Sequence, residues 1–332
     1  MDMDKIVNYD ELSKRISLNR QRLAEPSYRY PAVFAQGGEW YGDWQGRILL
    51  ALCSLYVSLS DEQEKDEVFM QLSDIVLHLD DAVNAGGYFG PLFNGKVADE
   101  QQISGNSWFL RGLCEYYKIF QEQRIISYLK KITDEFLLPL KPFFEHYPQV
   151  QRESGEVAGH SNDVLVDGWK LSSDVGCAFI LLDGMTAVYE VTHDVRLLDE
   201  MNVLINDFKK MDPVKVHCQT HATLSFVRGV LRFYAWTGNH DHLTFAKQTF
   251  ELYLSQGMTI DYANLNWFGR PDSWTEPCAI VDSFIVAKNL FLFTHEEKYL
   301  PLANRIYRTA IRTAQRANGG AGCNTCTYGP KA

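Results

Sequence analysis

The residues whose types and spacing favour chemistry lie towards the C-terminal end of the chain. Glu276-x-Cys278 is followed, further along, by Cys323-x-x-Cys326. A Cys-x-x-Cys pair is half of a common structural zinc site, and Cys278 with Glu276 supplies the other half. Three thiolates and one carboxylate would complete a tetrahedral shell. Two other interpretations stay open: a redox dithiol, for which the sequence offers no βαβ context, and a pair without a special role.

A second group of polar and aromatic side chains lies near the starts of the apolar segments and in the polar segments between them. Acids, amides, histidine and tryptophan together suit a pocket that holds hydroxyl groups and stacks sugar rings on aromatic faces. Two plainer interpretations remain, namely acids that cap helices and aromatic rings that fill a core. The candidate substrate-binding residues are Asp43, Trp44, Asn106, Trp108, Asp174, His221, Trp267 and Trp274, and the acids also suited to capping are Asp43, Asp99 and Asp174.

Helices must position these residues, because five segments of the chain are apolar on nearly all sides. A helix with this pattern is buried on both sides, and the segments are too long for buried strands. More amphipathic segments, such as 197–208 and 243–254, follow after short polar turns. Inner, buried helices therefore alternate with outer, half-solvated ones. The inner segments are 43–59, 104–120, 173–191, 220–236 and 278–293.

This alternation predicts an all-α fold, an (α/α)6-type toroid of helical hairpins, with an open α-solenoid as the alternative. A further helix over about 10–24 precedes the first hairpin and completes the outer ring. The helices that we expect are one helix fewer than six complete hairpins would contain. The starts of all inner helices share one end of such a ring, so the long loops before them lie on one rim. We expect the candidate residues to surround a single pocket on that rim.

Composition and charge exclude several classes of function. The net charge of −10 argues against a nucleic-acid partner, which requires clustered Lys and Arg. We expect no secretion signal at the N-terminus and no apolar stretch of the roughly 18 residues that span a membrane. Seven cysteines in such a chain predict reduced thiols in the cytoplasm. We expect a single domain over 1–332, and the abrupt end after Cys326 suggests a fragment of a longer protein.

The segment 275–279, Thr-Glu-Pro-Cys-Ala, resembles the Glu-x-Cys-Ala motif of β-L-arabinofuranosidase-like proteins, which form glycoside hydrolase family 127 and its relatives. Cys323 and Cys326 resemble the cysteine cluster that follows in that family. The segment 219–222, with Arg228 and Tyr234 after it, resembles the helix start of the family that contains His-Ala, and 43–47 resembles its N-terminal helix. The resemblance covers most of the chain, and its specific signals are the Glu-x-Cys motif and the cysteines.

The resemblance implies a barrel in which Zn²⁺ is bound by Glu276, Cys278, Cys323 and Cys326. It also implies a retaining glycosidase that acts on a furanoside, such as a β-L-arabinofuranoside or a related sugar, as part of an oligosaccharide or glycoside. In the family a zinc-bound cysteine attacks the anomeric carbon, and a glutamate protonates the leaving oxygen. Metal binding makes the thiolate available at neutral pH.

Three departures from the family pattern affect the catalytic assignment. The family's cysteine pair is adjacent, whereas two residues separate Cys323 from Cys326, so we take Cys326 as the nucleophile and Cys323 as its alternative. Upstream of Glu276, where the family has its general acid, Asp261 is the group able to donate a proton. Asn106 replaces a family histidine. The family's C-terminal β-domains are absent from this sequence.

Three hypotheses for function follow. The first is a zinc-dependent glycosidase with a cysteine nucleophile. The second is a metal-free hydrolase, lyase or epimerase that uses His221 and paired acids, Asp43 with Asp174 or Asp261. The third is a sugar-binding protein without catalysis and with a structural zinc. Metal analysis and a Cys278→Ser variant would separate them, because only the first requires the metal for turnover.

Overall fold

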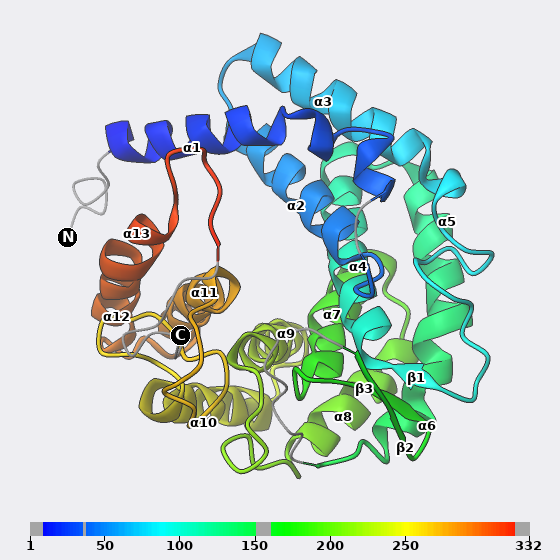
Figure 1. The fold of residues 1–332 in the computed structure, drawn as a ribbon, viewed down its shortest axis with the longest axis vertical. Helices are drawn as coiled ribbons and strands as arrows, with labels where there is room; N and C mark the ends of the chain where they lie inside the picture. Colours follow the sequence, from blue (N-terminus) through cyan, green and yellow to red (C-terminus); the bar gives the residue numbers. More distant parts are fainter. Residues whose placement is uncertain (1–8, 36–37, 151–160, 323–332) are drawn as a thin grey trace.

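Helices arranged as a ring make up most of the described chain. The computed structural model describes residues 9–35, 38–150 and 161–322. Figure 1 shows α2, α4, α7, α9 and α11 following one another around the ring, with α1, α3, α5, α8, α10 and α12 outside them. The predicted all-α toroid is therefore confirmed. The helices are α1 (Tyr9–Leu23), α2 (Asp43–Ser58), α3 (Glu62–Leu77), α4 (Glu100–Phe120), α5 (Gln123–Ile132), α6 (Lys141–Phe144), α7 (Leu181–Thr192), α8 (Arg196–Phe208), α9 (Thr220–Thr237), α10 (His240–Gln256), α11 (Pro277–Thr294), α12 (Tyr299–Arg305) and α13 (Arg312–Ala314).

The inner helices pack directly on one another, because their apolar surfaces leave no hydrated face. In α4, which lies between α2 and α7, 16 of 21 residues are buried. Gly46 of α2 lies so close to α4 that a Cβ atom would come within 2.2 Å of the Phe109 backbone nitrogen. Gly229 of α9 lies similarly close to α7, since a Cβ atom on Gly229 would lie 2.8 Å from the carbonyl carbon of Leu182. A larger residue at either position would force two helices apart.

The polar turns predicted after the inner helices are present. His193, Gly238 and His295 end α7, α9 and α11, each in the left-handed conformation with φ between 53° and 65°. Each backbone N–H group there returns to a carbonyl of the preceding helix, which satisfies part of the open helix end. The chain then reverses into the next outer helix.

Of the three acids proposed as possible helix caps, one is a cap. Asp99 begins α4 and accepts hydrogen bonds from the backbone N–H groups of Gln101 and Gln102. Asp43 is instead the first residue of α2, and Asp174 precedes the glycine that begins the next helical turn. These two acids are therefore available to the rim.

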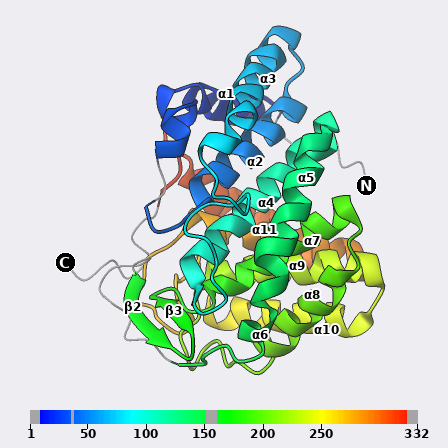
Figure 2. The same ribbon diagram turned by 90° about the vertical axis from the view of Figure 1, so that its right-hand side faces the viewer.

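A small sheet interrupts the helical ring and was not predicted. It has the order β1-β3-β2, formed by Ala98–Asp99, Trp169–Ser172 and Ser161–Val166. The turn between β2 and β3 is Asp167-Gly168, with φ of 49° and 84°, the dipeptide that favours a tight hairpin. Figure 2 shows this hairpin at one end of the helices. The inner segment expected over 173–191 accordingly forms α7 only from Leu181, after a short 3₁₀ turn.

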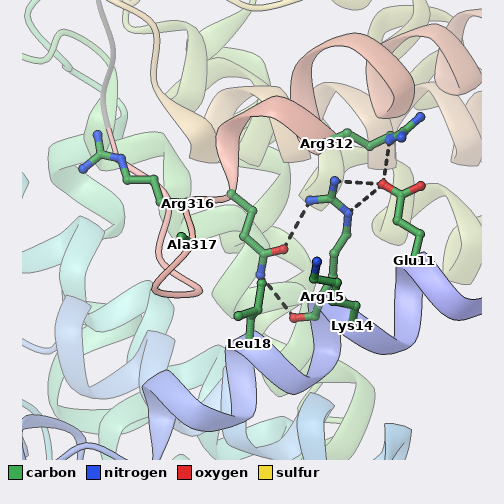
Figure 3. Close-up of a pocket in the computed structure, with 8 residues that line it drawn as sticks. Glu11, Lys14, Arg15, Leu18, Arg312, Arg316 and Ala317 are labelled. Carbon is green, nitrogen blue, oxygen red and sulfur yellow. Dashed lines mark hydrogen bonds and ion pairs between the residues drawn. The ribbon is translucent and has the colours of Figure 1, made fainter.

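The ring closes where α1 meets the segment after α12. Arg15 donates to Gln315 Oε1 at 3.2 Å, and Arg312 donates to Glu11 at 2.6 Å. These groups line a cavity of about 530 Å³, which Figure 3 shows with its ion pairs. The described residues provide five inner helices, so the predicted shortfall from six hairpins holds for this part of the chain.

One expectation about hydrophobic length was wrong. Helix α11 has 18 residues and a mean hydropathy of 1.4, so its length and composition match those of a membrane span. It packs against α9 and α12 as part of the ring. A core helix in the wall of such a ring can have the same length and hydropathy as a membrane span. Helix α11 is therefore weak evidence for a membrane.

Candidate functional site

A cavity of about 230 Å³ opens on the rim where the inner helices begin. Its walls come from the starts of α2, α4, α9 and α11 and from the segments before α7 and α11, as expected for loops that share one rim. Acids, amides, one cation and two indole rings meet there. The lining residues are Trp40, Asp43, Arg47, Ser104, Asp174, Ile180, Gln219, His221, Asn266, Trp274 and Glu276.

Several buried polar atoms of this cavity have no hydrogen-bond partner among the described residues. They are Ser104 Oγ and both side-chain amide atoms of Asn266, and the indole N–H group of Trp108 shares this property nearby. The Trp267 side chain lies within reach of the Asp174 carboxylate and lowers its pKa slightly against the effect of burial. Buried polar groups in native proteins are nearly always paired. The unmet capacity therefore indicates that water or a polar ligand completes the cavity.

Asp174 is the acid best suited to donate a proton. Its side chain is 3% exposed, and its backbone N–H donates to Ser172 Oγ at the end of β3. Burial, reinforced by the neighbouring Glu276 carboxylate, raises the pKa of Asp174 to about 7. A carboxyl with this pKa keeps much of its proton at neutral pH, which general acid catalysis requires.

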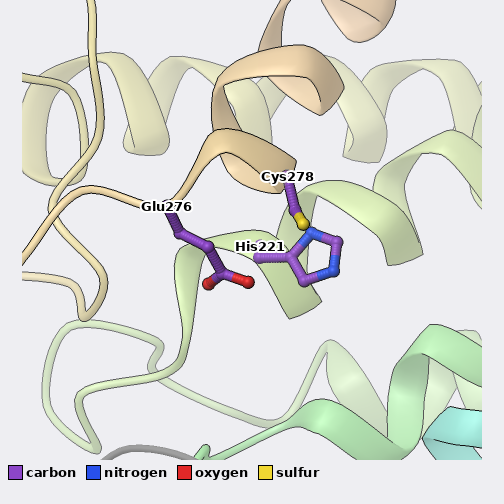
Figure 4. A group of neighbouring side chains, drawn as sticks. All are labelled: His221, Glu276 and Cys278. Carbon is purple, nitrogen blue, oxygen red and sulfur yellow. The ribbon is translucent and has the colours of Figure 1, made fainter. Parts of the chain in front are cut away.

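Three potential metal ligands converge beside this acid. Figure 4 shows His221 from α9 together with Glu276 and Cys278 from the start of α11. Their donor atoms all lie within 4.8 Å of one another. One imidazole, one carboxylate and one thiol form a donor set that suits zinc. Glu276 is the N-cap residue of α11, and its carboxylate accepts a hydrogen bond from Gln219 at 3.3 Å.

Arg47 connects these ligands to the rest of the site. Its Nε group binds both oxygens of Asp43, at 2.8 and 2.9 Å, and its Nη atoms approach Cys278 Sγ at 3.5 Å and His221 Nε2 at 3.3 Å. The guanidinium also lies 3.9 Å from the centre of the Trp108 ring, within range of a cation–π interaction. Burial alone would lower the pKa of Arg47, but the carboxylates of Asp43 and Glu276 outweigh it and raise the pKa.

Burial raises the pKa of the Cys278 thiol to about 12, although Arg47 acts in the opposite direction. A thiolate at this position therefore needs a stronger positive charge than Arg47, and a metal ion provides one. The residues present thus fit the zinc that the sequence resemblance implies.

The structure brings some of the predicted residues to the cavity and leaves others outside it. Asp43, Asp174, His221, Trp274 and Glu276 line it. Trp108 lies beneath them and stacks on His221, with ring centres 5.8 Å apart. Trp267 packs against Trp274, with ring centres 4.7 Å apart.

Three predicted residues have other contacts. Trp44 stacks on Tyr28 in the outer part of the ring. Asn106 is fully buried and holds the loop before α4 through the backbone N–H and carbonyl of Phe89. Asp261 is exposed and bonds to Thr259 in its own loop, so it is not among the cavity residues. Cys323 and Cys326 lie outside the described residues.

Arg47 and Asp282 belong to the site but were not among the predicted residues. Each is a charged residue inside a segment that is mostly apolar, at 43–59 and 278–293. Charged residues are rarely buried without a partner. Asp282 meets Arg228 of the neighbouring α9, whereas Arg47 pairs with Asp43 one turn earlier in its own helix. A charged residue within an apolar segment is visible in the sequence, but the sequence does not show which residue pairs with it.

No protein-family model matches the chain, and no curated protein matches its sequence. Solved structures with the same fold do. A D-mannose isomerase superposes with a TM-score of 0.61 and 13% identity, over 95% of this chain and 88% of that one. The cellobiose 2-epimerase from Bacillus thermoamylovorans B4167 gives 0.62 and 17%, over 96% and 91%.

A glycoside hydrolase family 127 β-L-arabinofuranosidase from Geobacillus stearothermophilus T6 is also similar, with a TM-score of 0.57 and 12% identity. The match covers 92% of this chain and 51% of that one, so the chain spans about half the length of that enzyme. These likenesses show that the fold is the α/α toroid shared by glycoside hydrolases and sugar isomerases and epimerases. The family 127 resemblance of the sequence agrees with them at the level of the fold.

Proposed function

We propose that the chain is a carbohydrate-active enzyme that cleaves a glycosidic bond in the rim cavity, with Asp174 as the proton donor. The observation that carries the proposal is the Asp174 carboxyl, which is buried in the wall of a polar cavity beside the Glu276 carboxylate. The leaving oxygen of a glycoside would take the proton from this carboxyl. Asn266, Ser104 and Gln219 would bind sugar hydroxyl groups, and Trp40 and Trp274 would stack on the ring.

Glu276 and Cys278, with Cys323 and Cys326 from outside the described residues, are proposed to hold Zn²⁺. When bound, zinc keeps its cysteine ligands as thiolates at neutral pH. The geometric fit of Glu276 and Cys278 and the family resemblance support this part of the proposal, and Cys326 or Cys323 remains the candidate nucleophile. A furanoside, such as a β-L-arabinofuranoside, is the substrate class that the resemblance favours.

The second candidate is metal-free isomerisation or epimerisation of a free sugar. A specific observation favours it: His221 is 3% exposed in the cavity wall, and the carboxylates of Glu276 and Asp174 face the same space. A base and an acid on one sugar are sufficient to move a proton between carbon and oxygen.

The test combines metal analysis with substrate screening of the purified full chain. Aryl glycosides, arabinofuranosides first, are assayed for hydrolysis, and free aldoses and ketoses are followed by NMR for isomerisation. Zinc at one equivalent and hydrolysis that chelation abolishes support the first proposal. Turnover of free sugars without metal supports the second, and zinc without any turnover contradicts both in favour of a binding protein.

A further inference from the structure

The two ring nitrogens of His221 have different partners, and these partners indicate where the ring proton lies. Besides the two contacts that follow, Ser225 Oγ lies 3.4 Å from Nδ1 and donates its own proton to Asp282. Nδ1 lies 3.0 Å from Asp282 Oδ2, and an ionised carboxylate only accepts hydrogen bonds. Nε2 lies 3.3 Å from Arg47 Nη2, and a guanidinium only donates. Both contacts are satisfied by one form alone, the neutral imidazole with its proton on Nδ1 and a lone pair on Nε2.

Asp282 is itself fixed from two further directions. Ser225 Oγ donates to Oδ2 at 2.6 Å, and the guanidinium of Arg228 binds Oδ1. Asp282 is 2% exposed, and Arg228 is 8% exposed. Burial alone would raise the pKa of Asp282, but Arg228, His221 and Ser225 hold it below its usual value. The carboxylate therefore remains an acceptor for the imidazole N–H.

A second aspartate lies behind this contact. Arg228 also pairs with Asp183 of α7 at 3.3 Å, and Arg111 of α4 and Arg232 of α9 bind the same carboxylate at 3.1 and 2.8 Å. Asp183 is 1% exposed and lines none of the cavities described above. Helices α4, α7, α9 and α11 thus all contribute to one chain of ion pairs that ends on the imidazole.

We propose that Asp282 and Arg228, with Asp183 behind them, are positioning residues that fix His221 as the Nδ1-protonated tautomer and present its Nε2 lone pair to Arg47 at the wall of the rim cavity. A sugar hydroxyl would bind to Nε2 in place of Arg47, because the single lone pair accepts one donor. Stacking on Trp108, with the ring planes 13° apart, restricts the tilt of the imidazole in the same arrangement. The tautomer is independent of the proposed function, and only its effect on turnover rests on that function.

The first test is a measurement on the wild-type full chain. Two-dimensional ¹⁵N NMR of protein labelled on its histidines distinguishes the two ring nitrogens, and a His221→Gln variant identifies the His221 signals among those of nine histidines. We expect a protonated Nδ1 and an unprotonated Nε2. A proton on Nε2 would overturn the proposal, whether or not any variant folds.

The second test uses Asp282→Asn. Arg228 requires an oxygen, so the new amide would turn its NH₂ group towards His221 Nδ1 and transfer the ring proton to Nε2. We expect this shift in the NMR signals and a fall in kcat on the order of 10–100-fold, with KM changed less. The control is Asp207→Asn, since Asp207 is a buried aspartate of α8 paired with Lys210.

The outcomes of the two variants are distinguishable. A folded Asp282→Asn protein that keeps the wild-type His221 tautomer contradicts the positioning role. Equal shifts of the His221 signals in both variants also contradict it. If the wild-type protein turns over no sugar, the proposed function fails, while the tautomer measurement still decides the role of Asp282.

Discussion

Two cavities of the ring, one at its closure and one at the rim, differ in volume and in how completely their polar groups are paired. The cavity at the ring closure is the larger, at about 530 Å³ against about 230 Å³ at the rim. Its carboxylate is paired, because Glu11 accepts from both Arg15 and Arg312. The rim cavity leaves the Ser104 hydroxyl and both side-chain amide atoms of Asn266 without partners among the described residues. Unmet hydrogen-bonding capacity, rather than volume, therefore distinguishes a site for a ligand from a gap between elements.

The largest expected effect in this comparison is on turnover. Asp174→Asn removes the proton but keeps the size of the side chain, so we expect kcat to fall by about 10²–10⁴-fold. Steady-state kinetics on the best substrate of the screen measure it, with Asp207→Asn as the matched buried control. Unchanged kcat in the Asp174 variant would remove this residue from the mechanism.

The same residue predicts a pH dependence of stability. The pKa of Asp174 is about 7 in the folded state, above the ordinary 3.8, so the folded protein binds more protons between those values. Its contribution to stability is therefore lost as the pH rises from about 4 to 7. Asp174→Asn should be the more stable protein at pH 8, by up to about 4 kcal/mol, and the difference should vanish near pH 4.

Urea unfolding of both proteins across this pH range measures the difference. Subtracting the two curves removes the contributions of other groups, such as Glu200, whose pKa burial also raises. A difference that is constant with pH would mean that Asp174 is solvated in the folded state.

A smaller effect is expected on metal binding. Cys278→Ala removes one of the converging ligands, so zinc affinity should fall at least about tenfold. Competition with a chromogenic chelator measures it. Cys53→Ala is the control, because Cys53 is buried in α2 away from the cavity and should bind zinc as the wild type does.

Stacking at the rim should contribute less than the ligands. Trp274→Ala is expected to raise KM by about 3–10-fold, since one aromatic contact is worth about 0.5–1.5 kcal/mol. Trp236→Ala is the control, because this indole is 45% exposed at the far end of α9. An equal rise in both variants would show that the effect does not arise in the rim cavity.

The smallest effect is expected at the ring closure. Arg312→Ala removes an exposed ion pair with Glu11, so kcat and KM should stay within about twofold of wild type. The same kinetic assay applies. A loss of activity comparable to that of the Trp274 variant would mean that the larger cavity also takes part in function.

The fold was predictable because the inner and outer helices differ in hydrophobic pattern along the chain. Apolar segments such as 220–236 became α9 almost residue for residue. The sheet was missed because its strands are short and its signal is confined to Asp167-Gly168. Two residues in the left-handed region carry that information, and they lie outside any periodic segment.

The site was only partly predictable, because pairing between helices is not encoded in spacing. The sequence shows that Asp282 sits in an apolar helix, but not that Ser225, Arg228 and His221 meet it there. The sequence also does not show whether an acid is buried. Asp174 and Asp261 both lie in polar segments before inner helices, yet Asp174 is buried and Asp261 is exposed.

The glycines at the helix crossings have a consequence for how such a ring can vary. Where Gly46 meets α4, backbone touches backbone, so no exchange of side chains can widen the wall by a small step. New specificity is more easily acquired through the loops that precede the inner helices, which tolerate changes in length and composition. The ring therefore acts as a fixed frame, and the diversity of sugars accepted by proteins of this shape would reside in its rim.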